Sequence, residues 1–375
     1  MTNTACLTFF PTLNHKHDER LVMVNDANFK GQKILVVGGA GFIGSNLVYQ
    51  LLEHDPAEIM IVDNMISADY SNIPEDTRVK FVYGSITDDR ILATLNEDLD
   101  YAFHLACYHG NQSSIADPIA DHANNTFTSL KLFERLKDIR SLKKVVYAAA
   151  ACAVATKTYG AAEATTEDQP VSLFHDSPYS ISKIIGELYG NYYWERHGLP
   201  FVKARFSNAY GPREILGAGH WRGTVNTVWR NVTPTFIWRS LAGEALPLDN
   251  GGNASRDFIF VEDMARGLQA CALRGGLGET YNLATGSETT ILELAKLINE
   301  FTGNITPLDL RPARDWDRSG NRFASTEKAR QELGFESQVD IREGIRRTVE
   351  WTKVNRDRIS LCMAKHDKLM AQTQS

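Results

Sequence analysis

A glycine-rich turn between a short apolar segment and a helical one is the feature that most limits how this chain can fold. Residues 33–37 read Lys-Ile-Leu-Val-Val, the apolar and β-branched pattern of a buried parallel strand. Gly38, Gly41 and Gly44 follow, and residues 45–53 have helical spacing. In such a unit the glycines permit a tight turn, close approach of the backbone to a pyrophosphate, and packing of the helix on the strand. The helix N-terminus then binds the anion through its N–H groups and its dipole.

A second apolar segment ends in an acidic residue that suits the ribose of a dinucleotide. Residues 58–63 read Glu-Ile-Met-Ile-Val-Asp, and Asp63 follows Gly44 by about 20 residues. A carboxylate at this place binds a pair of ribose hydroxyls and repels a 2′-phosphate, so we expect NAD rather than NADP. The alternative is an α/β turn without a nucleotide, in which Asp63 caps a helix.

The order of the remaining segments predicts an α/β protein. Apolar segments alternate with amphipathic ones, which is typical of a doubly wound (Rossmann) parallel sheet. We expect further strands at residues 79–85, 101–107, 143–152 and 201–206, and helices at 88–96, 119–137, 178–197 and 325–333. We assign residues 1–30 to a polar extension, 31–208 with returning segments at about 237–285 to the nucleotide-binding domain, and 209–236 and 286–375 to a smaller C-terminal α/β substrate lobe.

Composition excludes several classes of function. The net charge is −6 and no dense Lys/Arg run occurs, which argues against a nucleic-acid surface. The cysteines are odd in number and lack metal-ligand spacing, so we expect free thiols, no metal site and a reducing compartment. They are Cys6, Cys107, Cys152, Cys271 and Cys362. No apolar run is long enough to cross a membrane, and we expect a cytoplasmic protein.

A tyrosine and a lysine supply the predicted acid–base chemistry. Ser177 and Pro178 are typical of a helix start, and Tyr179 and Lys183 stand four apart on one face of that helix. The ammonium, together with a positive nicotinamide ring, would favour the phenolate of Tyr179. That phenolate could take a proton from a sugar hydroxyl while hydride leaves the same carbon.

With these motifs the chain resembles the extended short-chain dehydrogenase/reductase family, in its branch of nucleotide-sugar epimerases and dehydratases. The resemblance runs from about residue 33 to 351. It rests on Gly-Gly-Ala-Gly-Phe-Ile-Gly at 38–44, Tyr-Ser-Ile-Ser-Lys at 179–183, Arg-Phe-Ser-Asn-Ala-Tyr-Gly-Pro at 205–212, Arg-Asp-Phe-Ile-Phe-Val-Glu-Asp at 256–263, and the segments 325–329 and 332–335.

The resemblance implies a tightly held NAD and a UDP-, dTDP- or GDP-sugar substrate. It assigns to the cofactor Gly38, Gly41, Phe42, Ile43, Asp63, Asn64, Ser85, Ile86, Leu105, Ala106, Asn125, Tyr179, Lys183 and Phe206. It assigns Asn208, Asn231 and Val232 to the sugar-nucleotide, and Arg256 and Arg311 to its diphosphate, where the alternative for each arginine is a surface ion pair. It also implies a homodimer through a four-helix bundle of helices 119–137 and 179–197.

The chain departs from the family at the strand end that faces Tyr179. The Ser or Thr that normally binds the reacting hydroxyl is replaced by Ala149 and Ala150. Cys152, two positions further, resembles the acid/base cysteine of GDP-mannose 3,5-epimerases, although their partner lysine has no clear match; the other interpretation is a buried core cysteine. The histidines His104, His109, His122 and His175 have no partner at metal or triad spacing, and we expect rim or core roles for them.

The same strand end favours simple C4 epimerisation. It lacks the Asp-Glu pair of 4,6-dehydratases and the Glu of decarboxylases. Hydride removal at C4 and its return after rotation of the keto-sugar therefore becomes the first hypothesis. The alternatives are a C3/C5-epimerase that uses Cys152, a net sugar-nucleotide oxidoreductase, and a catalytically impaired NAD-binding regulatory protein.

Overall fold

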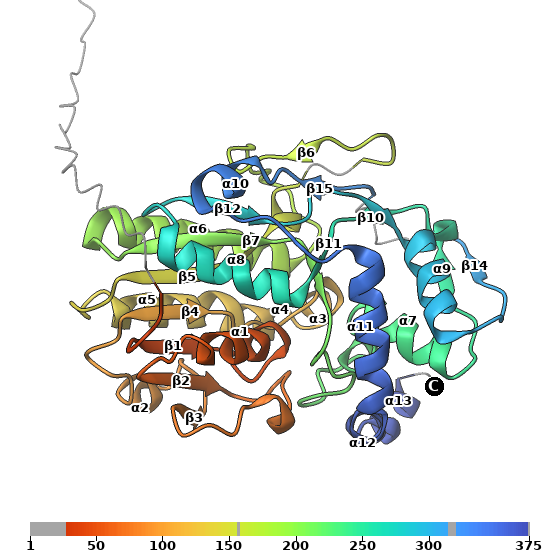
Figure 1. Cartoon of the computed structure of the whole chain (residues 1–375), viewed down its shortest axis with the longest axis horizontal. Coiled ribbons are helices and arrows are strands. Elements are labelled where there is room, and N and C mark those ends of the chain that lie inside the picture. Colours follow the sequence, from red (N-terminus) through yellow and green to blue (C-terminus); the bar gives the residue numbers. More distant parts are fainter. Residues whose placement is uncertain (1–27, 156–157, 314–319, 374–375) are drawn as a thin grey trace, which may run out of the picture.

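A seven-stranded parallel sheet forms the centre of the molecule, in the order β12-β7-β5-β4-β1-β2-β3 (Figure 1). The computed structural model describes residues 28–155, 158–313 and 320–373. The sheet strands are β1 (Lys33–Val37), β2 (Glu58–Asp63), β3 (Val79–Tyr83), β4 (Tyr101–His104), β5 (Lys144–Ala150), β7 (Phe201–Phe206) and β12 (Thr280–Leu283). This is the doubly wound sheet predicted from the alternating pattern.

Helices cover both faces of the sheet, which explains why its strands are apolar on both sides. Side chains of α1 (Phe42–Leu52), α8 (Val261–Arg274) and α10 (Glu327–Leu333) share one core cluster with alternate strand residues. The remaining strand residues pack with α2 (Asp89–Leu92), α5 (Thr128–Leu136) and α6 (Pro178–His197). The sequence places the segment of α10 in the substrate lobe, but Ala329 and Leu333 pack in the core that α1 and α8 form with the sheet.

The glycine turn joins β1 to α1 as predicted, and its geometry requires glycine at two positions. Gly38 has φ +87°, and a Cβ there would lie 2.5 Å from the backbone nitrogen of Ala106. A Cβ on Gly44 would lie 2.1 Å from the carbonyl oxygen of Gly38. Since neither backbone can move away without breaking the turn, these glycines set the approach of α1 to the sheet.

A second apolar core lies beside the sheet and forms the lobe. It is built from α7 (Val232–Leu241), α9 (Ile291–Thr302), α11 (Ile341–Val354), β8 (Asn208–Tyr210), β9 (Pro247–Asp249) and β11 (Phe258–Phe260), with β14 (Asp309–Arg311) pairing β9. The other short elements are α3 (Asn111–Ala116), α4 (Pro118–Asp121), β6 (Ala164–Thr165), β10 (Ser255–Arg256), β13 (Thr289–Thr290), β15 (Phe323–Ala324), α12 (Arg356–Ala364) and α13 (Asp367–Gln372).

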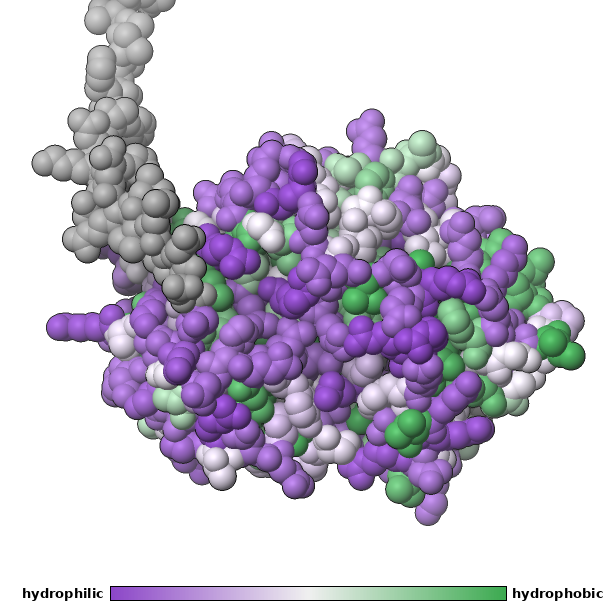
Figure 2. All heavy atoms as spheres, in the orientation of Figure 1, coloured by the Kyte–Doolittle hydropathy of each residue, from purple (hydrophilic) through white to green (hydrophobic). Residues whose placement is uncertain are grey.

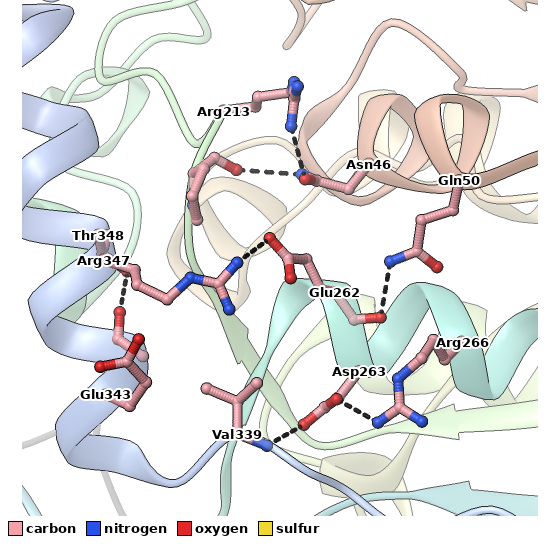
Figure 3. A network of polar contacts seen from close by, with 12 residues as sticks. Asn46, Gln50, Arg213, Glu262, Asp263, Arg266, Val339, Glu343, Arg347 and Thr348 are labelled. Carbon is pink, nitrogen blue, oxygen red and sulfur yellow. Dashed lines mark hydrogen bonds and ion pairs between the residues drawn. The ribbon is translucent and has the colours of Figure 1, made fainter. Parts of the chain in front are cut away.

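Polar contacts join the lobe to the helix that follows the glycine turn (Figure 3). Gln50 on α1 donates to the carbonyl of Glu262 at 3.0 Å, and the side chain of Glu262 is ion-paired with Arg347 on α11. Asp263 is buried and accepts the backbone N–H of Val339 at 2.9 Å, just before α11. Because α1, α8 and α11 share these contacts, the two parts of the molecule are held in a fixed relation on this side.

Several predicted boundaries differ for local reasons. The helix expected at 88–96 is a single turn, and the one expected at 119–137 contains a π-helical segment, His122–Phe127. The strand expected at 101–107 ends at His104, because the N–H groups of Leu105 and Ala106 both turn to the carbonyl of Val37. The segment 1–27 of the predicted N-terminal extension lies outside the described residues.

The surface is mainly hydrophilic on the face drawn in Figure 2, with apolar residues scattered over it. Among the helices of the described residues, none combines the length and apolarity needed to cross a membrane. The four cysteines in the described ranges are free thiols, as predicted; Cys6 lies outside these ranges.

Candidate active site

A cavity of about 700 Å³ opens at the carboxyl ends of the sheet strands and extends to the lobe. The glycine turn, the end of β5 and the start of α6 line one part of it, and residues around the start of α7 line another. Ligands of open α/β sheets bind at this edge, because the strand ends and the loops that follow them converge there.

The dinucleotide part of the cavity has the features that a pyrophosphate and ribose require. Gly41 precedes α1 without a side-chain cap, so the first N–H groups of the helix remain for an anion. The Asp63 carboxylate lies at the cavity wall and accepts the N–H groups of Ala40 at 3.1 Å and Met65 at 2.9 Å. Burial raises the pKa of Asp63, against the effect of these hydrogen bonds. The residues present therefore fit a dinucleotide.

The structure brings nearly all of the predicted site residues to this cavity. Those that line it are Gly38, Gly41, Phe42, Ile43, Asp63, Asn64, Leu105, Ala106, Cys152, Tyr179, Lys183, Phe206, Asn208, Asn231, Val232, Arg256 and Arg311. Ser85 and Ile86 line a smaller recess that shares Asp63, Asn64 and Ala106 with the cavity. Asn125 lines neither; its Oδ1 accepts the N–H of Tyr108 at 2.7 Å, so it fixes the loop after β4.

Tyr179 and Lys183 both face the cavity from the first turns of α6. Ser177 caps the helix by accepting the N–H of Ser180 at 3.3 Å, and the N–H of Tyr179 donates to the hydroxyl of Ser114 at 3.1 Å. Lys183 is 4% exposed, and its Nζ donates to the carbonyl of Ala148 at 2.8 Å. The ammonium lies 5.8 Å from the centroid of the Tyr179 ring.

The electrostatics of Tyr179 differ from the simple expectation. Burial raises the pKa of its phenol well above the ordinary value, and the neighbouring Cys107 thiol acts in the same direction. Lys183 alone therefore does not hold a phenolate in the protein. The predicted ionisation of Tyr179 also depends on a second cation, the positive nicotinamide ring.

The end of β5 carries no hydroxyl next to Tyr179. Ala149 and Ala150 line the cavity and are nearly fully buried. Cys152 follows in a 3-10 turn, Ala151–Ala153, where it is half-buried and lines the cavity. Cys152 is therefore not a buried core residue, which was the alternative interpretation of its sequence position.

A polar cluster that sequence spacing did not reveal lies against Tyr179. Cys107 and His109 follow β4, and the thiol and the imidazole act on each other electrostatically. His109 Nε2 lies 3.1 Å from Oδ1 of Asn231, and the amide of Asn231 donates to the Glu214 carboxylate. The signal available in the sequence was the place of Cys107 and His109 just beyond a strand end, not a motif.

The predicted diphosphate arginines have protein partners. Arg256 is 9% exposed and donates to the carbonyls of Ser255 and Gly320, each at 2.6 Å. Arg311 is exposed and forms an ion pair with Asp309 at 2.7 Å, which is the surface pair that we considered as its alternative. Both still line the cavity.

His104, one of the histidines singled out in the sequence, has a structural rather than a catalytic environment. His104 is buried, with Nε2 3.0 Å from the hydroxyl of Ser129, and burial lowers its pKa to about 3. Within residues 28–155, 158–313 and 320–373, no group of three or more His, Cys, Asp or Glu residues could hold a metal ion.

Comparisons with known proteins agree with this geometry. A family model described as NAD dependent epimerase/dehydratase matches residues 34–284. The chain is 31% identical to a UDP-glucose 4-epimerase of Mycolicibacterium smegmatis over 325 residues, which cover 85% of this chain and 98% of that protein. It is 30% identical to a dTDP-glucose 4,6-dehydratase of an Actinoplanes species over 338 residues, with 86% and 98% covered.

A solved structure with higher identity is the Bordetella bronchiseptica enzyme WbmF in complex with NAD+. It is 55% identical, has a TM-score of 0.83, and the match covers 92% of this chain and 99% of that one. The same enzyme is also solved with NAD+ and UDP together, and with NADH.

Proposed function

The chain belongs to the NAD dependent epimerase/dehydratase family, a part of the extended short-chain dehydrogenases/reductases, and on this premise we propose that it is an NAD-dependent epimerase of a nucleotide-diphosphate sugar. The observation that carries the proposal is the placement of Tyr179 and Lys183 at the wall of the cavity that also contains the glycine turn. We propose inversion at C4 as the reaction.

Different residues of the cavity would hold the cofactor and the substrate. The turn Gly38–Gly44 and Asp63 would hold the pyrophosphate and ribose of NAD, and Lys183 the nicotinamide ribose. Bound NAD+ would supply a hydride acceptor that later returns the hydride. Asn208, Asn231 and Val232 line the cavity on the lobe side, where the sugar-nucleotide would lie. UDP, bound with NAD+ in the structure of WbmF, is the nucleotide we would test first.

Tyr179 would remove the proton of the C4 hydroxyl while hydride leaves the carbon, and would return the proton when hydride comes back. If the keto-sugar turns over between the two steps, the configuration at C4 is inverted. The end of β5 offers alanines where a dehydratase needs an acidic pair, so this strand end provides no route to the loss of water.

Two alternative functions receive less support. A catalytically impaired regulatory protein has no need of a buried lysine beside a cavity tyrosine, and both residues are in place. A net oxidoreductase would have to release NADH and bind new NAD+ in every cycle, so cofactor exchange distinguishes it from an epimerase. We further propose that the protein is cytoplasmic. We also propose a homodimer, because α6 carries the exposed apolar side chains Ile181, Leu188 and Tyr192.

A labelled substrate tests the reaction. The protein is incubated with NAD+ and UDP-, dTDP- or GDP-hexoses that carry deuterium at C4. The expected result is a mixture of C4 epimers that keeps the deuterium at C4, with no net accumulation of NADH. Accumulation of NADH with one keto product would indicate an oxidoreductase, and unchanged sugar with bound NAD would support the regulatory alternative.

A further inference from the structure

We propose that Cys107 and His109 form a second acid–base pair in this cavity, which removes and returns the proton on a ring carbon next to the transient 4-keto group. The inference rests on the proposed function, since only oxidation at C4 makes that proton acidic. It adds a proton transfer at C3 or C5 to the hydride transfer at C4.

Cys107 and His109 lie in the part of the cavity where the substrate's ring carbons would lie. Cys107 and His109 follow the end of β4, and both line the cavity together with Tyr179. The His109 ring meets the Tyr179 ring edge-on, with centroids 5.9 Å apart. A substrate whose C4 oxygen contacts Tyr179 therefore has its neighbouring ring carbons close to this pair.

Hydrogen bonding fixes which nitrogen of His109 can accept a proton. The amide nitrogen of Asn231 donates to Glu214, so its Oδ1 is the atom that faces His109 Nε2 at 3.1 Å. An amide oxygen only accepts, and Nε2 therefore carries hydrogen. Nδ1 is left as the basic nitrogen, and Cys107 is the thiol that acts on this imidazole.

The surrounding charges favour transfer of the thiol proton to the imidazole. Burial opposes ionisation of Cys107, but Lys183, His109 and the Arg222 guanidinium lower the pKa of its thiol. Burial also opposes the charged form of His109, but the neighbouring Cys107 thiol raises the pKa of the imidazole. The Cys107 thiol also acts on the phenols of Tyr179 and Tyr147, both of which have raised pKa values.

The proton transfer balances without a further reactant. The Cys107 thiolate takes the proton, so that an S–H bond forms as the C–H bond breaks. The electron pair of the C–H bond moves into an enolate whose negative charge lies on the C4 oxygen. Return of the proton by Cys107 restores the carbon, whereas delivery by a second acid inverts it, and Cys152 is the other thiol that lines the cavity.

Solvent deuterium tests the transfer at the carbon. Wild-type protein with NAD+ and the accepted nucleotide sugar in D2O should place deuterium at C3 or C5. Cys107→Ala should lose this incorporation by at least about 100-fold, the scale of a general-base contribution, while a C4 label is still removed and returned. Cys271→Ala, which removes a buried thiol outside the cavity wall, should behave like wild type.

The outcomes separate this inference from the proposed function. C4 chemistry without deuterium at C3 or C5 would overturn the inference and leave the proposed function standing. Incorporation that survives in Cys107→Ala would also overturn it. Absence of any C4 chemistry would refute the proposed function and the proton transfer with it.

A readout on the protein without substrate tests the ion pair itself. The rate of alkylation of Cys107 by iodoacetamide, followed by peptide mass spectrometry, should reach half its plateau at a pH below about 8.5, the pKa of a free cysteine. His109→Gln should shift that midpoint upward by one pH unit or more. An unchanged midpoint in His109→Gln would show that the imidazole does not ionise the thiol.

Discussion

The imidazole of His109 lies edge-on against the phenol of Tyr179, with an angle of 85° between the two rings. The contact joins the end of β4 to the first turn of α6. It places a titratable ring beside the group that we propose as the acid–base at C4, so the two proton-transfer steps would share one wall of the cavity. Changes to either residue therefore need separate readouts for C4 and for its neighbouring carbons.

Tyr179→Phe should abolish the reaction at C4 without loss of the fold. The substitution removes the hydroxyl that would exchange a proton with the C4 oxygen, and we expect a fall in turnover of about 100-fold or more. Dinucleotide binding, measured by calorimetry, should remain because the glycine turn is untouched. Tyr192→Phe on the exposed part of the same helix is the control and should retain full turnover. Equal activity of the two variants would refute the role of Tyr179.

Ala150→Ser should accelerate hydride transfer at C4. The residue ends β5, is 4% exposed and lines the cavity, so a hydroxyl there gains access to the substrate with little volume added. One new hydrogen bond of about 1 kcal/mol corresponds to a rate increase of about fivefold. Single-turnover NAD reduction measures the step. Ala153→Ser, beyond the cavity lining, should give no increase. A slower Ala150→Ser would indicate that the hydroxyl function is supplied by another residue.

Local patterns were sufficient to predict the part of the site that lies within one or two consecutive elements. The strand, the turn with Gly38 and Gly44, and the acid at Asp63 form one continuous unit, and their spacing carries the structural information. Tyr179 and Lys183 are neighbours on one helix face, so their proximity also follows from the sequence.

The cluster around His109 could not be predicted in this way. His109 and Asn231 are 122 positions apart and meet only because the end of β4 and the start of α7 close the same cavity. Asn231 and Glu214 likewise depend on the path of the lobe. The position of α10 was missed for a similar reason, since its apolar stripe fits either core and the chain path decides between them.

Glu187→Gln should strongly lower the stability of the fold. Glu187 on α6 forms two hydrogen bonds with Arg205 on β7, at 2.9 and 2.8 Å, and both side chains are almost fully buried. Loss of the carboxylate leaves a buried guanidinium without its counter-charge, which costs about 3–5 kcal/mol in the free energy of unfolding. Urea denaturation measures the difference. Glu195→Gln on the exposed face of α6 should change stability by less than about 0.5 kcal/mol.

Leu188→Glu should separate the proposed homodimer into monomers. Leu188 is 60% exposed, and with Ile181 and Tyr192 it forms an apolar stripe on one side of α6. A carboxylate buried in an interface between two such helices would lose its hydration. Light scattering at several protein concentrations measures the mass. Leu361→Glu on α12, also exposed, should leave the mass unchanged. A wild-type protein that is monomeric at all concentrations would refute the bundle.

Glu214 should make the stability of the protein fall as the pH rises. Burial raises the pKa of its carboxyl to about 7 from the ordinary value of 4.5, and one carboxylate oxygen has no hydrogen-bond partner. The groups that face it, Asn231, His109 and Arg230, only partly offset this effect. Between pH 4.5 and 7 the folded protein holds a proton that the unfolded chain releases, so the folded state loses stability as the pH rises through this window.

Glu214→Gln isolates this contribution. Gln keeps an oxygen that can accept the hydrogen bond of Asn231 but does not ionise, so the variant should gain stability relative to wild type as the pH rises from 5 to 8. The relative gain should be about 3 kcal/mol, at about 1.4 kcal/mol for each pKa unit. His109 has a raised pKa and changes stability in the same direction, so wild type and variant are compared at each pH by thermal unfolding. A constant difference between Glu214→Gln and wild type would mean that Glu214 is already ionised at pH 5.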